Sequence, residues 1–177
     1  MKGSRVAKRY ARALLEIAER SQVESWGAEL HKLAAMVEEP ELMTRLTAPE
    51  LSLENRQLAM GKIAERLGLS FPLRSLAVVV ARHGRIQEIG AIAQAYSDLV
   101  DDLLGRTRAT LTFAVQPTDA QVARVVSGLE AIAGKKIIST IKINGALLGG
   151  VTAELGGKIY DGSLAARLAE AQHRLAG

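Results

Sequence analysis

The stretch Gly105–Val115, GRTRATLTFAV, lies where the hydrophobic pattern of the chain changes. Its threonine-rich composition and its alternation of larger and smaller residues are typical of a β-strand. The segments before it repeat their apolar residues with helical spacing instead. The chain is therefore predicted to be mainly α, with a helical N-terminal domain over residues 1–105 and a small α/β domain over residues 106–177.

Six helices are predicted before Gly105. In the first, over Val6–Glu19, apolar residues recur every three or four positions. Ser21 and Glu24 have the spacing of a capping box and are expected to begin the second helix, which should end near Pro40. A short third helix is expected over residues 40–46, a fourth from Ser52 to Gly68, and a sixth over residues 85–104.

The fifth segment, FPLRSLAVVVARHGR (residues 71–85), is ambiguous because Leu76–Ala81 is apolar on every side. Periodicity does not separate a buried helix from a buried strand here, and three successive valines favour a strand. Pro72 and the pair His83-Gly84 favour a helix, since they suit its first turn and its C-terminal cap. We predict a helix at the centre of a bundle.

The C-terminal domain is predicted to continue with a helix that Thr118 and Gln121 open through a capping box and that runs to about Ala133. The stretch KKIISTIKI (residues 135–143) alternates like a strand, and Ile137, Thr140 or Ile141, and Ile143 compete for its inner face. Beyond it, glycine doublets at 149–150 and 156–157 flank two short strands and predict a hairpin. A last helix, capped by Asp161 or Ser163, is expected to reach Leu175.

The glycines raise the question of a phosphate-binding loop, since six of them fall between Gly145 and Gly162. A P-loop needs glycines followed by Lys and Ser or Thr at the start of a helix, and a dinucleotide fingerprint needs G-x-G-x-x-G. Neither pattern occurs, and every glycine falls between segments that carry a strand or helix pattern. We interpret these glycines as turns.

The amino-acid composition limits the kinds of core, surface and membrane segment that the chain can form. The chain has no cysteine, and its aromatic content is 3%, so its core must be built from Ala, Leu, Ile and Val. The net charge of +4, with basic residues gathered near the start, is interpreted as a solvated surface, because Tyr10 alone could stack on a base there. No transmembrane segment or signal peptide is expected, because no apolar run is long enough.

Residues for catalysis are not predicted to come together. The three histidines lie on separate segments, and the adjacent Asp101 and Asp102 would point about 100° apart on a helix. We therefore expect no enzyme activity, no cofactor and no metal site. The histidines concerned are His31, His83 and His173.

Both ends of the chain resemble one family. The start VAKRYARALLEIAE and the end LLGGVTAELGGKIYDGSLAARL resemble the δ subunit of F-type ATP synthases, called the oligomycin-sensitivity-conferring protein in mitochondria. The stretch ARHGRI resembles the joint between the fifth and sixth helices of that family. The resemblance spans the full length of the chain. Gly157, Asn144-Gly145 and Leu164-Ala165 depart from the family pattern.

This resemblance implies a six-helix N-terminal bundle and a non-catalytic stator subunit of the peripheral stalk. Such a subunit links the α/β head to the b subunits, so that rotation is coupled to proton translocation and ATP synthesis. It binds the N-terminal helices of the α subunits and the ends of the b subunits, at the cytoplasmic face of a bacterial plasma membrane. The resemblance places the α-subunit helix between the first and fifth helices, which here gives Tyr10, Ala13, Leu14, Ile17, Ser75, Val78, Val79 and Arg82.

Two other classes of function remain open at this stage. The basic first helix could bind nucleic acid, whose affinity would fall steeply with salt. The turn GGKIYDGS could bind phosphate in an enzyme, and a nucleotide would then protect it from proteolysis. The apolar members of the proposed groove could equally be ordinary core.

Overall fold

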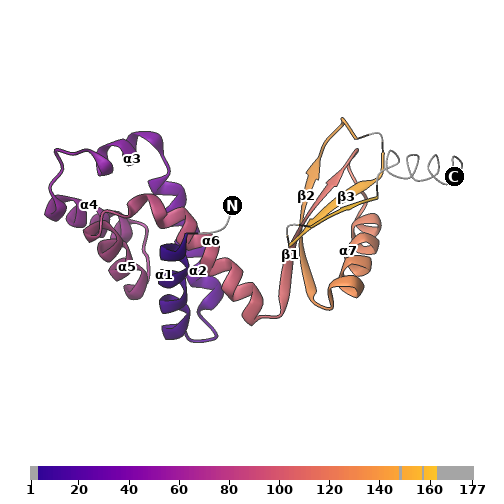
Figure 1. Cartoon of the computed structure of the whole chain (residues 1–177), viewed down its shortest axis with the longest axis horizontal. Coiled ribbons are helices and arrows are strands. Elements are labelled where there is room, and N and C mark those ends of the chain that lie inside the picture. Colours follow the sequence, from indigo (N-terminus) through magenta and orange to yellow (C-terminus); the bar gives the residue numbers. More distant parts are fainter. Residues whose placement is uncertain (1–3, 148, 157, 163–177) are drawn as a thin grey trace, which may run out of the picture. The chain divides into compact units, whose positions relative to one another are not determined.

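The computed structural model describes residues 4–147, 149–156 and 158–162 of the 177-residue chain (Figure 1). Within that part, six α-helices precede the first strand, and a seventh lies between the first two strands. The prediction of a mainly helical chain with a small sheet is confirmed. The helices are α1 (Arg5–Ile17), α2 (Val23–Val37), α3 (Pro40–Thr47), α4 (Leu53–Arg66), α5 (Phe71–Arg82), α6 (Ile89–Leu103) and α7 (Asp119–Ala133), with a 3₁₀ turn, η1 (Ile86–Glu88), before α6.

Contacts between residues divide the chain into two compact units, Met1–Val100 and Asp101–Gly177. The first holds α1 to α5 and most of α6. The second holds α7 and four strands, which are β1 (Arg106–Phe113), β2 (Lys136–Ile143), β3 (Val151–Leu155) and β4 (Lys158–Asp161).

The core of the N-terminal unit is aliphatic, as the composition requires. One face of α2 is buried along its whole length, and α6 buries a second row. Each fully buried side chain of this size contributes about 1.5–3 kcal/mol relative to its exposed state. The buried residues are Val23, Trp26, Leu30, Leu33 and Val37 on α2, and Ile89, Ile92, Tyr96 and Val100 on α6.

Local capping chemistry decides where several helices begin. The Ser52 hydroxyl accepts the Asn55 N–H at 3.2 Å, so α4 begins where it was predicted. At α7, Thr118 and Gln121 form the predicted capping box, in which the Thr118 N–H donates to Gln121 Oε1 at 2.8 Å. The capping box predicted at Ser21 is wrong. Gln22 precedes α2 with helical backbone angles and no side-chain cap.

The ambiguous fifth segment is a helix, as predicted. The prediction of a central helix buried on every side is wrong, because only one of its sides is buried. Leu73, Ala77, Val80 and Ala81 are fully buried, whereas the opposite side of α5 is open to solvent. Gly84 follows the helix with φ +64°, the left-handed conformation expected of a C-terminal glycine. The helix therefore has a core face and an exposed face.

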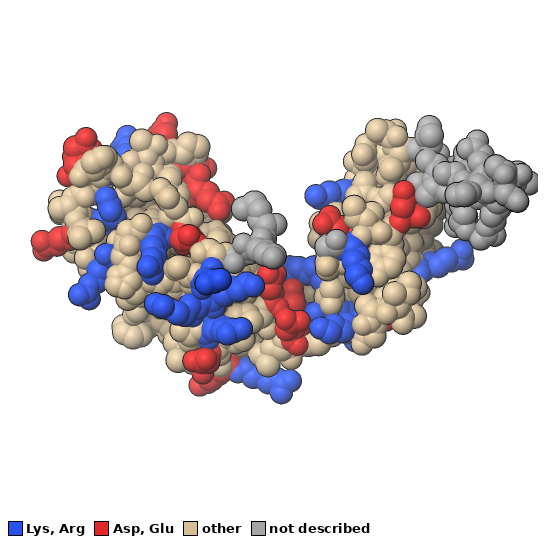
Figure 2. All heavy atoms as spheres, viewed as in Figure 1, with Lys and Arg blue, Asp and Glu red and all other residues tan. Residues whose placement is uncertain are grey.

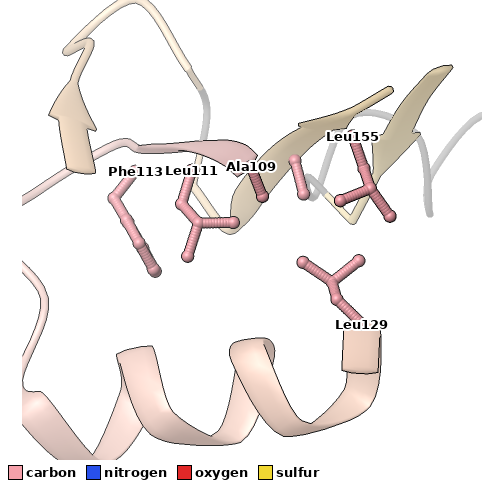
Figure 3. Close-up of a cluster of buried hydrophobic side chains, with 6 residues drawn as sticks. Ala109, Leu111, Phe113, Leu129 and Leu155 are labelled. Carbon is pink, nitrogen blue, oxygen red and sulfur yellow. The ribbon is translucent and has the colours of Figure 1, made fainter. Parts of the chain in front are cut away.

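The C-terminal unit is a four-stranded mixed sheet in the order β2-β1-β3-β4. β1 pairs in parallel with β2, through the crossover helix α7, and antiparallel with β3. Leu129 of α7 points toward buried side chains of the sheet, Leu111 and Leu155 among them (Figure 3). Of the isoleucines that compete for the inner face of β2, Ile137 packs against this cluster, whereas Ile141 and Ile143 are exposed.

The predicted hairpin is present, with β3 and β4 paired antiparallel around Gly156. Gly156 has φ +57°, a region that side chains with a branched Cβ resist. Asp161, one of the two predicted caps of the last helix, is the final residue of β4. The other cap, Ser163, and the last helix itself lie outside the described residues.

A buried carboxylate joins the end of α6 to β1. Asp101 is 6% exposed, and its two oxygens accept from Arg106 Nε at 2.8 Å and Arg108 Nε at 2.5 Å. Its neighbour Asp102 forms a separate ion pair with Lys135 at 3.3 Å. The two carboxylates thus serve different partners, and the last turn of α6 is held to the sheet.

We expect Tyr96→Phe to stabilise the protein. Burial raises the pKa of Tyr96 to about 12, and its hydroxyl has no hydrogen-bond partner within the described part of the chain. As the pH rises from about 10 to about 12, only the unfolded chain loses this proton, so the free energy of unfolding falls by about 2–3 kcal/mol. Tyr96→Phe should abolish that loss and add about 1 kcal/mol at neutral pH. Urea unfolding at several pH values measures both, and Tyr10→Phe should keep the alkaline loss.

A second variant tests the hairpin. Gly156→Val places a β-branched side chain at positive φ and should cost at least about 1 kcal/mol. Hydrogen exchange should show the loss in the C-terminal unit alone. Equal loss of protection in both units would mean that they unfold as one cooperative structure.

Candidate functional site

The surface of α1 has an apolar face that the core does not use. Ala7, Ala11 and Leu14 form its buried row. A second row lies about 100° around the helix, because each of its members is offset by one residue. This second row, which we call the apolar row of α1, is accessible to solvent, with Ile17 62% exposed. Its members are Val6, Tyr10, Ala13 and Ile17.

Helix α5 presents an apolar surface of the same kind. Its side opposite the core carries Phe71, which is 76% exposed, and Val79, which is 41% exposed. Ser75 lies between them, four residues from each, so the side chain at the middle of this face is small. Val78 is half-buried beside Val79, and Arg82 ends the face at the C-terminus of the helix.

Two contacts fix the position of α5. The Ser70 N–H, at the start of the helix, donates to Glu29 Oε2 of α2 at 2.6 Å. A carboxylate at this position satisfies a free N–H and complements the positive end of the helix dipole. On the side of α4, a Cβ atom built on Gly61 would lie 3.7 Å from Val78 Cγ2, so the two helices pack closely there. These two contacts therefore hold the exposed face of α5 in a defined position.

The structure leaves seven of the eight sequence-predicted residues accessible. Ala13, Ile17, Ser75, Val79 and Arg82 are exposed, and Tyr10 and Val78 are half-buried. Leu14 is 4% exposed and belongs to the core of the unit, as the alternative interpretation of these apolar residues allowed.

Phe71 belongs to the same face and was missed by sequence analysis. It is the most exposed large hydrophobic side chain in the described part of the chain. Its position four residues before Ser75 was the available signal. The capping role of Glu29 had no such signal, because Glu29 and Ser70 are 41 residues apart.

The described histidines that were considered for catalysis lie far apart in the sequence and in different surroundings. His31 Nε2 lies 2.9 Å from the Ser97 hydroxyl, and His83 follows the last turn of α5. His173 lies outside the described residues. In the part of the chain that the structure describes, no group of three or more His, Cys, Asp or Glu could hold a metal ion. No described helix is long and apolar enough to cross a bilayer.

The C-terminal unit has an open hollow of about 550 Å³ at one end of its sheet. Phe113 and Val115, at and beyond the end of β1, line it together with Val125 of α7 and the glycines at 149 and 150. Val115 is 74% exposed. The hollow is mainly apolar, which suits a protein side chain better than a charged ligand.

These features define a mainly helical protein that exposes apolar helix faces and carries a small mixed sheet. The family model described as "ATP synthase delta (OSCP) subunit" matches residues 6–175. The chain therefore belongs to the ATP synthase delta (OSCP) subunit family, whose members are components of the peripheral stalk.

Relatives and a solved structure agree with this family. The chain is 35% identical over 173 residues to "ATP synthase subunit delta" of Anaeromyxobacter sp. (strain Fw109-5), covering 96% of each chain. It is 31% identical over 174 residues to the protein of the same name from Geobacter sp. (strain M21), covering 97% of each. A chain of the Toxoplasma gondii mitochondrial ATP synthase hexamer has the same fold, with a TM-score of 0.66 at 19% identity, over 98% of this chain and 99% of that one.

We expect Glu29→Ala to loosen α5. The variant removes the acceptor of the Ser70 N–H, and the loss of a helix cap costs about 0.5–2 kcal/mol. Lys32→Ala, at an exposed position on the same helix, is the matched control and should change stability little. Chemical unfolding measures both, and hydrogen exchange should locate the loss in the first turn of α5. Equal stability of the two variants would contradict the capping role.

Proposed function

We propose that the chain is a non-catalytic stator subunit that links the α/β head of an ATP synthase to the b subunits of the peripheral stalk. In this role it stops the head from turning with the rotor, so that rotation is coupled to proton translocation and ATP synthesis. The complex would hold it at the cytoplasmic face of a bacterial plasma membrane. The observation that carries the proposal is the pair of exposed apolar faces on α1 and α5.

The first contact in this proposal is with the α subunits. We propose that α1 to α6 form one bundle and that the apolar row of α1 and the exposed face of α5 border one groove. An amphipathic helix from the N-terminus of an α subunit would lie in that groove. Ala13 and Ser75 are small and exposed, so they would let a guest helix approach closely. Ile17, Phe71 and Val79 would bury the apolar area that makes the contact tight.

The second contact is with the b subunits, through the domain over residues 106–177. The apolar hollow beside Phe113 and Val115 supports this assignment, because it can take a side chain from a partner. Two separate surfaces, one on each unit, are what a subunit that joins two partners requires. The N-terminal domain over residues 1–105 would then hold the head, and the C-terminal domain the stalk.

Ala13→Asp tests the groove. Ala13 is exposed, so the free variant should fold normally, because its carboxylate stays in water. Binding an α-subunit N-terminal peptide would bury that carboxylate without a partner, which should cost about 3 kcal/mol or more. Isothermal titration calorimetry measures the loss. In reassembled complexes, ATP hydrolysis should continue while the proton pumping that it drives fails.

The control is Ala35→Asp, at an exposed position on α2 outside both faces. It should bind the peptide like the unchanged protein and should support proton pumping. Unchanged binding by Ala13→Asp would refute the groove, and a peptide that binds neither protein would refute the contact with the α subunit.

A further inference from the structure

The positive charge of the chain is concentrated on the two helices that carry the proposed groove. Helix α1 has four basic residues and one acidic residue, Glu16, and α5 has two basic residues and no acidic one. Their combined net charge of +5 exceeds the +4 of the whole chain. All six basic side chains are exposed. They are Arg5, Lys8, Arg9 and Arg12 on α1, and Arg74 and Arg82 on α5.

Three of these cations border the apolar row of α1. Arg5, Arg9 and Arg12 follow the helical spacing i, i+4, i+7, so they form one row along the helix. Each precedes a member of the apolar row by one residue, which places the two rows about 100° apart. Glu16, four residues after Arg12 and one before Ile17, occupies the next position of this row and is acidic. From the N-terminus, this charged edge of α1 therefore carries three positive side chains followed by one negative side chain.

The three cations are unfavourable neighbours for one another in an isolated α1, and only Arg12 has an acidic residue of the same helix, Glu16, within one turn. Like charges three and four residues apart repel each other, and cations in the first turns oppose the helix dipole. The first turn of α1 contains no acidic residue. Among the residues that the structure describes, no carboxylate pairs with any of the three arginines, whereas Asp101 holds both Arg106 and Arg108. Figure 2 shows Lys and Arg side chains gathered on the N-terminal unit, over the region where Figure 1 draws α1.

We infer that the helix received by this surface carries carboxylates along the flank that meets Arg5, Arg9 and Arg12, and none opposite Glu16. The inference rests on the proposed docking of a helix between α1 and α5. It goes beyond that proposal by specifying the charge pattern of the guest. Cations beside an exposed apolar row match an amphipathic helix with one acidic edge, because both parts of the surface then gain a partner.

A nucleic acid fits the same surface less well. Its phosphates would neutralise the arginines, but within the apolar row only the half-buried Tyr10 could stack on a base. The apolar area of Val6, Ala13 and Ile17 would stay in water. An acidic amphipathic helix covers the cations and the apolar row together.

The uneven charge pattern also gives the guest a direction. The three cations lie in the first two-thirds of α1, and the single acid lies near its end. A guest helix that docks in the reverse direction would bring its carboxylates to Glu16 and leave the arginines unmatched. Such a repulsive element is a common source of specificity.

Binding to the full-length chain tests this inference. Three fluorescently labelled peptides serve as probes: the N-terminal segment of the α subunit from the same complex, a designed amphipathic helix with three Glu on one flank, and the same helix with three Lys there. Anisotropy titrations at low and at high salt should show the Glu peptide binding about tenfold or more tighter than the Lys peptide, with the gap narrowing as salt screens the charges. Equal affinity of the two designed peptides would overturn the inference.

Charge reversal on the protein provides the second arm. The double variant Arg9→Glu/Arg12→Glu should weaken the α-subunit segment and the Glu peptide by about three- to tenfold and should strengthen the Lys peptide. Arg45→Glu, at an exposed position on α3, is the matched control and should leave all three affinities unchanged. Circular dichroism confirms that each variant is folded.

The outcomes separate this inference from the proposed function. An α-subunit segment that binds equally to the unchanged chain and the double variant overturns the acidic flank and leaves the stator role standing. An α-subunit segment that does not bind, beside a Glu peptide that binds by charge, overturns the stator contact and supports the acidic flank. A single-stranded DNA oligonucleotide that binds tighter than every peptide, with a steep salt dependence, overturns both.

Discussion

The narrow buried face of α1 is the constraint from which the exposed surface of this helix follows. The buried row of this helix consists of Ala7, Ala11 and Leu14, and both alanines are fully buried. These three side chains cover only a narrow strip of the circumference of the helix. The larger apolar residues Tyr10 and Ile17 therefore fall outside the contact and remain accessible. A wider core face on α1 would have left no apolar row for a partner.

Sequence patterns predicted the elements well wherever a short-range interaction decides the outcome. Ser52 and Thr118 cap their helices through atoms three residues away, and Gly84 ends α5 because its backbone can take a positive φ. The prediction at Ser21 failed because Gln22 takes a helical conformation at the start of α2, so the serine lies outside the helix. A capping pattern shows that a cap is possible, but the neighbouring backbone decides whether it forms.

The candidate surface was harder to predict, because exposure is a property of the packed unit. The apolar run in α5 suggested burial on every side, yet Val79 lies on the exposed side of this helix. Tyr10 and Leu14 share one apolar pattern in the sequence, and only the structure separates the accessible tyrosine from the buried leucine. The contact between Glu29 and Ser70, which joins distant parts of the chain, could not be predicted from spacing.

The pairing order of the sheet sets the order in which parts of the chain can fold during translation. β1 needs β2 on one side and β3 on the other, so its hydrogen bonds are incomplete until residue 155 has left the ribosome. The contacts between residues place α1 to α5 and most of α6 in the unit that ends at Val100. Since domains generally fold as units and the N-terminal one folds first, we expect the helix faces on α1 and α5 to become available while the strands are still emerging. A partner that binds these faces could therefore engage the nascent chain before its other end exists.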